Sequence, residues 1–254
     1  MKFKTYKISE LINEIAMGPF GSNIKVECFV DDGVPVLNGS NLEGFELGEK
    51  SFRYVTEEKA DSLGRANVHK GDIIITHRGT LGQIVYIPET AKYNRYIISQ
   101  SQFRIRCNEK VLPEYLVYYF HTPIGQHKLL SNASQVGVPA LARPSSTFQK
   151  IEVDLPDLEI QRQVVKNIKS LQNKIALNNK INDNLERQAL ELFSNYQKAS
   201  DKKFALQMLS KSLEEEHQGQ KNLPIGMGIY RSLRQKMLVV RIRYQRKKQL
   251  QKMG

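Results

Sequence analysis

The residues best suited to chemistry in this chain are polar side chains that stand in or beside glycine-containing turns. Such side chains hydrogen-bond to base edges of nucleic acids, and glycine lets the backbone come close to a duplex. Arg78 is the best single candidate, because Gly79 follows it and the apolar run Ile73–Ile75 comes shortly before it. The full candidate DNA-binding set is Ser22, Asn23, Lys25, Asn38, Ser40, Asn41, His77, Arg78, Thr80, Gln83, Gln100 and Gln102.

Each of these residues also has an ordinary structural explanation. Asn38-Gly39 is a common sequence of tight hairpin turns, and Thr80 belongs to a residue type that satisfies local backbone groups. Arg104 and Arg106 present a similar choice, since alternation along a strand puts both on one face. That face is either solvated or in contact with phosphates, and the sequence leaves both alternatives open.

A search for catalytic motifs finds none with supporting context. The chain has no G-x-S-x-G, H-E-x-x-H or P-loop sequence, and no G-x-G-x-x-G after a strand. His69 and His77 lie close together without accompanying ligands, and Cys28 and Cys107 lack the spacing of a zinc site or a disulfide framework. We therefore expect no catalytic centre, no cofactor and no metal, and two reduced core cysteines.

The net charge of +12 is distributed unevenly along the chain. Lys and Arg equal Asp and Glu at 18 to 18 in residues 1–158, and exceed them by 7 to 4 in residues 159–199 and by 13 to 4 in residues 200–254. The excess therefore lies mainly in the C-terminal part. If the globular part binds DNA, a locally basic face on a neutral body must attract the phosphates.

Hydropathy predicts a folded protein of the cytoplasm. With 254 residues, 40% of them hydrophobic, the chain is long enough to bury a core. No stretch approaches the roughly 18 to 20 apolar residues of a membrane span. No apolar run resembling a signal peptide follows residues 1–5. We expect no membrane association.

Short β-type runs separated by turn residues occupy the chain up to about Cys107. The runs are Pro35–Leu37, Asp72–Thr76, Gln83–Pro88, Tyr96–Ser99 and Phe103–Cys107. Pro113 then opens a helix that extends to Phe120, and a second helix is expected around Ile124–Leu130. Residues 1–158 are thus predicted to form a β-rich, irregular domain of an α+β protein.

Residues 159–199 differ in kind, because core positions alternate in steps of four and three with no Gly or Pro. The seam consists of Val164, Ile168, Leu171, Ile175, Asn178, Asn182, Leu185, Ala189, Leu192 and Tyr196. This pattern predicts a coiled-coil helix on the order of 55 Å long, suited to a spacer or a docking surface. The alternative is a helix packed along its own domain. Residues 200–254 predict a loosely ordered basic tail that either touches phosphates or is solvated.

Four segments, in this order before the long helix, resemble the specificity subunit of type I restriction-modification enzymes, and specifically one half of it. They are Gly18–Ser22 (GPFGS), Val34–Asn38 (VPVLN), Lys70–Gly82 (KGDIIITHRGTLG) and Phe148–Gln161 (FQKIEVDLPDLEIQ). The resemblance covers roughly residues 5–196 and leaves the tail outside. It implies a target recognition domain, followed by a conserved helix that sets spacing and docks methyltransferase subunits. Because such subunits usually contain this unit twice, the chain resembles either a half-size form or a truncated or rearranged product.

The resemblance implies a non-catalytic subunit that directs methyltransferase and restriction (endonuclease/translocase) subunits to a bipartite site in double-stranded DNA. The seam adds that Asn178 and Asn182 fix one alignment of two helices, since buried asparagines penalise wrong registers. We therefore expect a homodimer through residues 159–196, antiparallel by analogy with the two-half design of the family. The alternatives are a stand-alone nuclease or methyltransferase, and a coiled-coil scaffold that does not read DNA.

Overall fold

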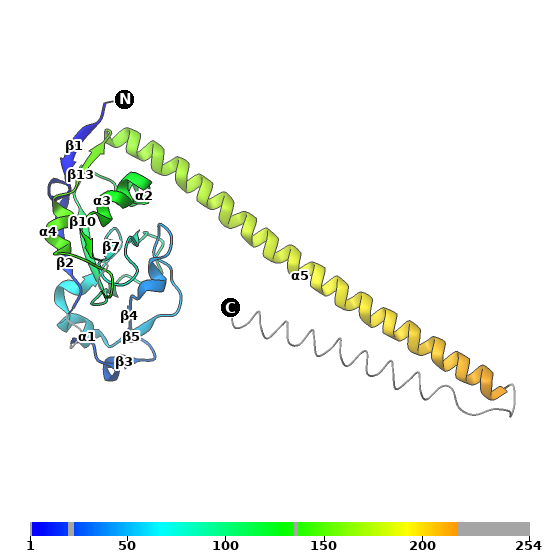
Figure 1. The fold of residues 1–254 in the computed structure, drawn as a ribbon. Helices are drawn as coiled ribbons and strands as arrows, with labels where there is room; N and C mark the ends of the chain where they lie inside the picture. Colours follow the sequence, from blue (N-terminus) through cyan, green and yellow to red (C-terminus); the bar gives the residue numbers. More distant parts are fainter. Residues whose placement is uncertain (1, 20–22, 135–136, 218–254) are drawn as a thin grey trace. The chain divides into compact units, whose positions relative to one another are not determined.

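A computed structural model describes residues 2–19, 23–134 and 137–217 (Figure 1). The chain divides into two compact units, Met1–Leu177 and Asn178–Gly254. The first unit contains all the sheets, and the long helix α5 (Leu158–His217) begins there and continues in the second. No helix in the described ranges is long and apolar enough to cross a membrane.

The first unit is built around a four-stranded antiparallel sheet with the order β2-β10-β7-β8. Its strands are β2 (Ile12–Met17), β10 (Gln102–Cys107), β7 (Ile73–Thr76) and β8 (Ile84–Tyr86). Three consecutive isoleucines of β7, Ile73 to Ile75, are all fully buried. Because neighbouring side chains of a strand point to opposite faces, this sheet must be covered on both sides.

One face of the central sheet packs against helices. Ile73, Ile75 and Phe103 belong to a hydrophobic cluster that also contains Phe120 and Phe148. The covering elements are α2 (Pro113–Phe120), α3 (Pro123–Leu130), α4 (Pro144–Gln149), and the antiparallel pair β1 (Lys4–Lys7) and β13 (Glu152–Leu155). The predicted helices at 113–120 and 124–130 are therefore confirmed.

The opposite face packs against a second, five-stranded sheet with the order β3-β5-β4-β9-β6. Its strands are β3 (Phe29–Val30), β5 (Arg53–Val55), β4 (Val34–Val36), β9 (Tyr96–Ile97) and β6 (Asn67–Val68), with α1 (Glu57–Ser62) beside them. Ile74 and Val85 of the central sheet join this second cluster. The five predicted β-runs all contain strands, which confirms the β-rich, irregular domain.

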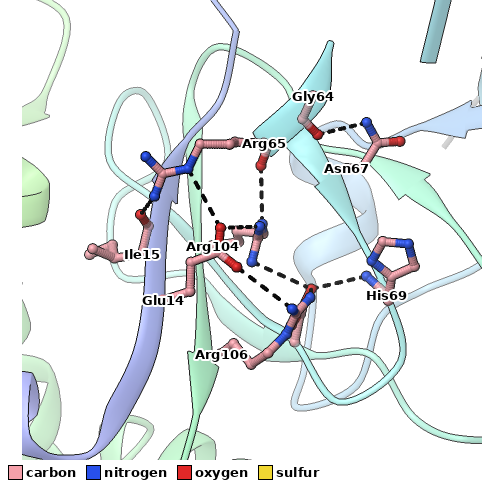
Figure 2. A network of polar contacts seen from close by, with 9 residues as sticks. Glu14, Ile15, Gly64, Arg65, Asn67, His69, Arg104 and Arg106 are labelled. Carbon is pink, nitrogen blue, oxygen red and sulfur yellow. Dashed lines mark hydrogen bonds and ion pairs between the residues drawn. The ribbon is translucent and has the colours of Figure 1, made fainter. Parts of the chain in front are cut away.

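Arg104 and Arg106 of β10 belong to a network of hydrogen bonds and ion pairs (Figure 2). Arg104 is only 4% exposed, and it donates hydrogen bonds to Glu14 Oε1 at 2.8 Å and to the Arg65 carbonyl at 3.1 Å. Arg106 donates from Nε and Nη2 to the two oxygens of Asp72, at 2.8 and 3.1 Å. For Arg104 the structure corrects both alternatives, because its side chain is neither solvated nor available to a phosphate. The side chain of Arg106 is 44% exposed and pairs with Asp72, so the alternative of a solvated face holds in part for this residue.

The electrostatics of this network favour the charged forms of Glu14 and Arg106. Burial opposes ionisation of Glu14, but the hydrogen bond and charge of Arg104, with the charges of Arg106 and Arg65, lower its pKa. The hydrogen bond to Asp72 raises the pKa of Arg106. The network is thus a set of paired charges that connects β2, β10 and the start of β7.

The first turns of α5 are held on the first unit by polar contacts. Gln161 is 1% exposed, accepts a hydrogen bond from the Leu112 amide at 3.0 Å and donates to the Pro156 carbonyl at 3.0 Å. Lys169 pairs with Glu114 at 3.0 Å. The buried Gln161 thus explains why a glutamine stands at the start of the long helix.

The predicted helix over residues 159–199 is present and continues further, to His217. The reason is visible in the sequence, since residues 200–217 are helix-compatible types and the first glycine after them is Gly219. The predicted basic tail over 200–254 is therefore helical in its first part, while residues 218–254 lie outside the described residues. Both cysteines are unpaired and half-buried, and burial raises the pKa of the Cys107 thiol to about 12.

Removing the charge of Asp72 tests the ion network. The side chain of Asp72 is 1% exposed, so Asp72→Asn leaves Arg106 and Arg104 short of a buried counter-charge. We expect the free energy of unfolding in urea to fall by about 2 to 3 kcal/mol, toward the lower end for a buried pair because Arg106 is partly solvated. The matched control is Asp61→Asn. The carboxylate of Asp61 is 70% exposed and pairs with Arg95, and such an exposed ion pair contributes less than about 1 kcal/mol to stability. Equal losses in the two variants would contradict a structural role for the network.

Candidate nucleic-acid interface

Several polar loops emerge from one edge of the central sheet. Gln102 of β10 is paired with Thr76 of β7, and Phe103 is paired with Met17 of β2. In this antiparallel sheet, β2 and β7 end at the edge where β10 and β8 begin. The loops after Met17 and Thr76 therefore leave from the same edge as the loops before Ile84 and Gln102, and most of the candidate residues lie in them.

His77 connects its own loop with the loop before Gln102 and with the segment at Leu141. Its amide donates to the Ser101 carbonyl at 2.9 Å, and its ring Nε2 lies 3.1 Å from the Gln100 carbonyl. The His77 carbonyl accepts from the Leu141 amide at 2.8 Å. Burial lowers the pKa of His77, as does the neighbouring charge of Arg78. His77 thus behaves as a neutral connector of loops.

Gln83 connects a further loop to the strand ends. Its Nε2 donates to the Gly39 carbonyl at 3.0 Å, and its Oε1 accepts from the Thr76 hydroxyl at 3.1 Å. In the loop that it reaches, the side chain of Asn38 accepts from the Ser40 amide at 2.9 Å and caps the 3₁₀ turn Gly39–Leu42. The loops around residues 38–41 and 76–83 are therefore neighbours.

A hairpin that the sequence reasoning missed flanks Arg78. It consists of β11 (Ala133–Ser134) and β12 (Ala140–Leu141). Ala140 forms a bridge with Arg78, and the Gly79 amide donates to the Pro139 carbonyl at 2.8 Å. The available signal was the turn-forming sequence Gly137-Val138-Pro139. The hairpin fixes the backbone of Arg78 while its side chain stays exposed.

The candidate residues separate by exposure into distinct groups. The exposed side chains are Asn23, Lys25, Ser40, Arg78, Thr80 and Gln100. The half-buried side chains that bond between or within loops are Asn38, His77 and Gln83. The buried side chains are Asn41 and Gln102, and Ser22 lies outside the described residues.

The burial of Asn41 and Gln102 argues against a direct contact of either side chain with a base. Asn41 donates to the carbonyls of Gly48 and Lys50 and accepts from the Asn38 amide, so all its side-chain groups are bonded. Gln102 accepts from the Ser99 amide at 2.9 Å. Both side chains build loops, because breaking such buried hydrogen bonds to reach a base is costly. The remaining residues stay predictions.

Asn23 and Lys25 stand apart from the other candidates. They precede the 3₁₀ turn Val26–Cys28 and strand β3 of the five-stranded sheet. In the described part of the chain, no hydrogen bond joins either side chain to the loops around His77. The contact between the segment after β2 and those loops is made by Gly18, whose amide donates to the Gln102 carbonyl at 2.8 Å.

The site offers hydrogen-bond donors and positive charge. In the described ranges, no group of three His, Cys, Asp or Glu side chains is arranged to hold a metal ion. Arg143, which precedes α4 and has a positive φ of 46°, adds an exposed cation after β12. Arg78 and its neighbours are therefore suited to binding an anionic surface with accessible hydrogen-bond acceptors.

The predicted partner-helix residues lie on α5 and divide between its two parts. Val164 and Ile168 are half-buried in the first unit. From Leu171 onward the seam is exposed, with 59% for Leu171, 60% for Ile175 and 70% for Leu192. The remaining seam positions, Asn178, Asn182, Leu185, Ala189 and Tyr196, are exposed as well. The exposed apolar side chains Leu177, Ile181, Leu190 and Phe193 lie outside the predicted seam.

Comparisons with known proteins identify the chain's relatives. Residues 2–187 match the model of the type I restriction modification DNA specificity domain. The type I restriction enzyme MjaIX specificity subunit of Methanocaldococcus jannaschii is 27% identical over 187 residues, which are 73% of this chain and 41% of that protein. The chain thus spans less than half the length of this relative.

One solved structure shows a similar fold. A structure from a study of complex assembly and conformational transition of the type I R-M system has a TM-score of 0.51 and 19% identity, and the match covers 68% of this chain and 39% of that one. The HsdS subunit from Thermoanaerobacter tengcongensis has a TM-score of 0.48 and 19% identity, over 68% and 38% of the two chains.

The close approach of Gly18 to the loop at Ser99 gives a test of the loop cluster. A Cβ at position 18 would lie 1.9 Å from the Ser99 carbonyl oxygen and 2.9 Å from that of Gln102, so Gly18→Ala must displace one segment. We expect the free energy of unfolding to fall by about 1 to 3 kcal/mol, measured by urea denaturation. In the control Gly39→Ala, the added carbon would lie 3.7 Å from Gln83 Oε1, an ordinary contact. A stability loss as large for the control would show that position 18 is not special.

Proposed function

We propose, because the chain belongs to the type I restriction-modification DNA specificity family, that it reads one half of a bipartite site in double-stranded DNA. In this proposal the chain itself has no catalytic centre. It directs methyltransferase and restriction subunits, which carry out the chemistry, to the site. It acts where the DNA of a bacterial-type cell is found, in the cytoplasm.

The observation that carries this proposal is the loop cluster at the edge of the central sheet. His77 and Gln83 use their hydrogen bonds to join loops, and Arg78 is left exposed between them on a backbone that β12 holds. A fixed backbone with a free guanidinium suits paired hydrogen bonds to O6 and N7 of guanine in the major groove. Ser40, Thr80 and Gln100 are the exposed polar neighbours that complete the proposed reading surface.

Selection from a random pool of DNA duplexes tests the function directly. The full chain, incubated with the pool at moderate salt, should retain duplexes that share a short motif. Co-expression with a candidate methyltransferase subunit should then place methylated bases of the genome within sites that contain the same motif. Retention of unrelated duplexes, together with methylation that does not depend on this chain, would overturn the proposal. DNA cleavage or methylation by the pure chain would favour the stand-alone enzyme instead.

Arg78→Ala tests the assignment of the main reading residue. We expect the variant to lose about 1 to 3 kcal/mol of binding free energy for the selected duplex and to tolerate more than one base at one position. Arg162→Ala, at an exposed arginine near the start of α5, serves as a control and should keep both affinity and base preference. Fluorescence anisotropy with labelled duplexes measures both quantities. An Arg78→Ala protein with the preference of the wild type would show that Arg78 does not read a base.

We further propose that α5 associates with helices of partners, including a second copy of this chain in antiparallel orientation. The support is the exposed apolar row that contains Leu171, Ile175 and Leu185, since isolated soluble helices seldom expose so many large apolar side chains. Association of two copies would give one recognition domain for each half of a bipartite site. The orientation is an inference from the family's two-half organisation, because heptads alone do not set direction.

The seam asparagines test this association. Replacing both Asn178 and Asn182 with leucine should raise the thermal stability of the assembly and produce mixed oligomers, because the polar pair no longer penalises other alignments. The matched control replaces Asn173 and Asn184 with leucine. These two residues lie roughly opposite the seam on an ideal helix, so the oligomer should stay unchanged. Light scattering measures the mass. A monomeric wild type at micromolar concentration, with or without DNA, would rule out association of two copies.

A further inference from the structure

A basic hollow lies at the base of the hairpin that flanks Arg78. It has a volume of about 560 Å³ and opens between the end of α3, the end of α4 and the start of β13, in the first unit. Its lining includes Lys128, Asn132, Thr147, Lys150 and Glu152. These side chains are all exposed or half-buried, so the hollow is open to solvent.

Among the residues that the structure describes, two ammonium groups of the hollow have no acidic partner. Nζ of Lys128 donates to the main-chain oxygen of Glu152 at 2.7 Å and lies 5.8 Å from the centre of the Tyr119 ring. These contacts hold the cation in place without neutralising it. Across the described ranges, neither Lys128 nor Lys150 takes part in an ion pair with a carboxylate.

Glu152, the acidic residue of the lining, does not remove the positive charge. Glu152 is paired across the β1–β13 ladder with Lys7, and opposite charges at such positions attract one another. Two lysines of the hollow therefore face a single carboxylate that has a cationic neighbour of its own. The hollow keeps a net positive charge available to an anion.

Backbone contacts connect the hollow to the loop that carries Arg78. Asn132 directly precedes β11, and its carbonyl accepts from the Ala142 amide at 3.1 Å. The Thr147 hydroxyl donates to the Ala142 carbonyl at 2.8 Å. On the hairpin's other side, Ala140 bridges to Arg78. The hollow and Arg78 therefore flank the same short hairpin.

We propose that this hollow binds a backbone phosphate of the DNA duplex whose bases the Arg78 loop reads, an inference that rests on the proposed function. An open, cationic hollow suits one phosphate of a polyanion, whereas small molecules are bound in concave sites that enclose most of their surface. Phosphate contacts fix the position of a protein on a duplex without carrying sequence information. Lys128 and Lys150 thus set the register in which Arg78 meets its base.

The salt dependence of binding separates this role from base reading. A plot of log affinity against log salt concentration has a negative slope, and each lost phosphate contact makes that slope shallower by about 0.9. We expect Lys150→Ala to weaken binding of the selected duplex and of a scrambled duplex by the same factor. The variant's affinity should then fall about threefold less than that of the wild type between 50 and 200 mM salt. Lys150→Glu should weaken binding further, and Lys128→Arg, which keeps the charge, should retain the wild-type slope.

Lys59→Ala is the matched control, because it also removes one lysine charge but does not alter the lining of the hollow. Lys59 lies on α1, beside Ala60 of the other hydrophobic cluster. It should leave affinity and slope unchanged, and thermal melting of every variant checks that it is folded. If Lys150→Ala and Lys150→Glu keep the wild-type slope while the wild type still prefers the selected duplex, the phosphate proposal fails and the proposed function stands. If the wild type does not distinguish the two duplexes, the proposed function fails, and the phosphate proposal fails with it.

Discussion

The buried guanidinium of Arg104 is the constraint on which the domain depends. Moving a charged group out of water is costly unless it is paired and hydrogen-bonded. Arg104 finds these partners on separate segments, with Glu14 on β2, the Arg65 carbonyl before β6, and Asp72 just before β7. Since β10 lies between β2 and β7, pairing this one buried charge requires all three strands in a single register. Nη1 of Arg104 reaches Asp72 only as an ion pair at 3.8 Å and makes no hydrogen bond.

That register determines where the polar loops lie at the opposite end of the sheet. The ion network lies where β7 begins and β10 ends, and the polar loops emerge from the opposite edge. Strands held in register deliver their loops to fixed places, where hydrogen bonds of His77 and Gln83 join them. Charge pairing in the interior thus positions the exposed guanidinium of Arg78. In the part of the chain that the structure describes, Arg78 forms no ion pair with an acidic side chain.

A division of labour among polar residues follows from this arrangement. In side chains that join or build loops, such as Asn41, the hydrogen-bonding groups are already bonded within the protein. The hydrogen-bonding groups of exposed side chains such as Arg78 remain available to a ligand. In the proposed function, the lysines of the hollow add charge without base specificity. The long helix contributes differently, because its first turns are anchored on α2 while its later part exposes apolar side chains.

The sequence by itself determined the features that depend on local periodicity and on ordered motifs. Period two in Phe103–Cys107 indicated a strand, the heptad seam indicated α5, and four short segments indicated the family. Tertiary structure decided which polar residues are buried. Asn41 and Arg104 look as exposed in the sequence as Arg78 does, because their burial depends on partners that only folding brings close. The contact of the hairpin at 133–141 with Arg78 is likewise long-range, since hydrogen bonds between distant segments leave no periodic signal in either one.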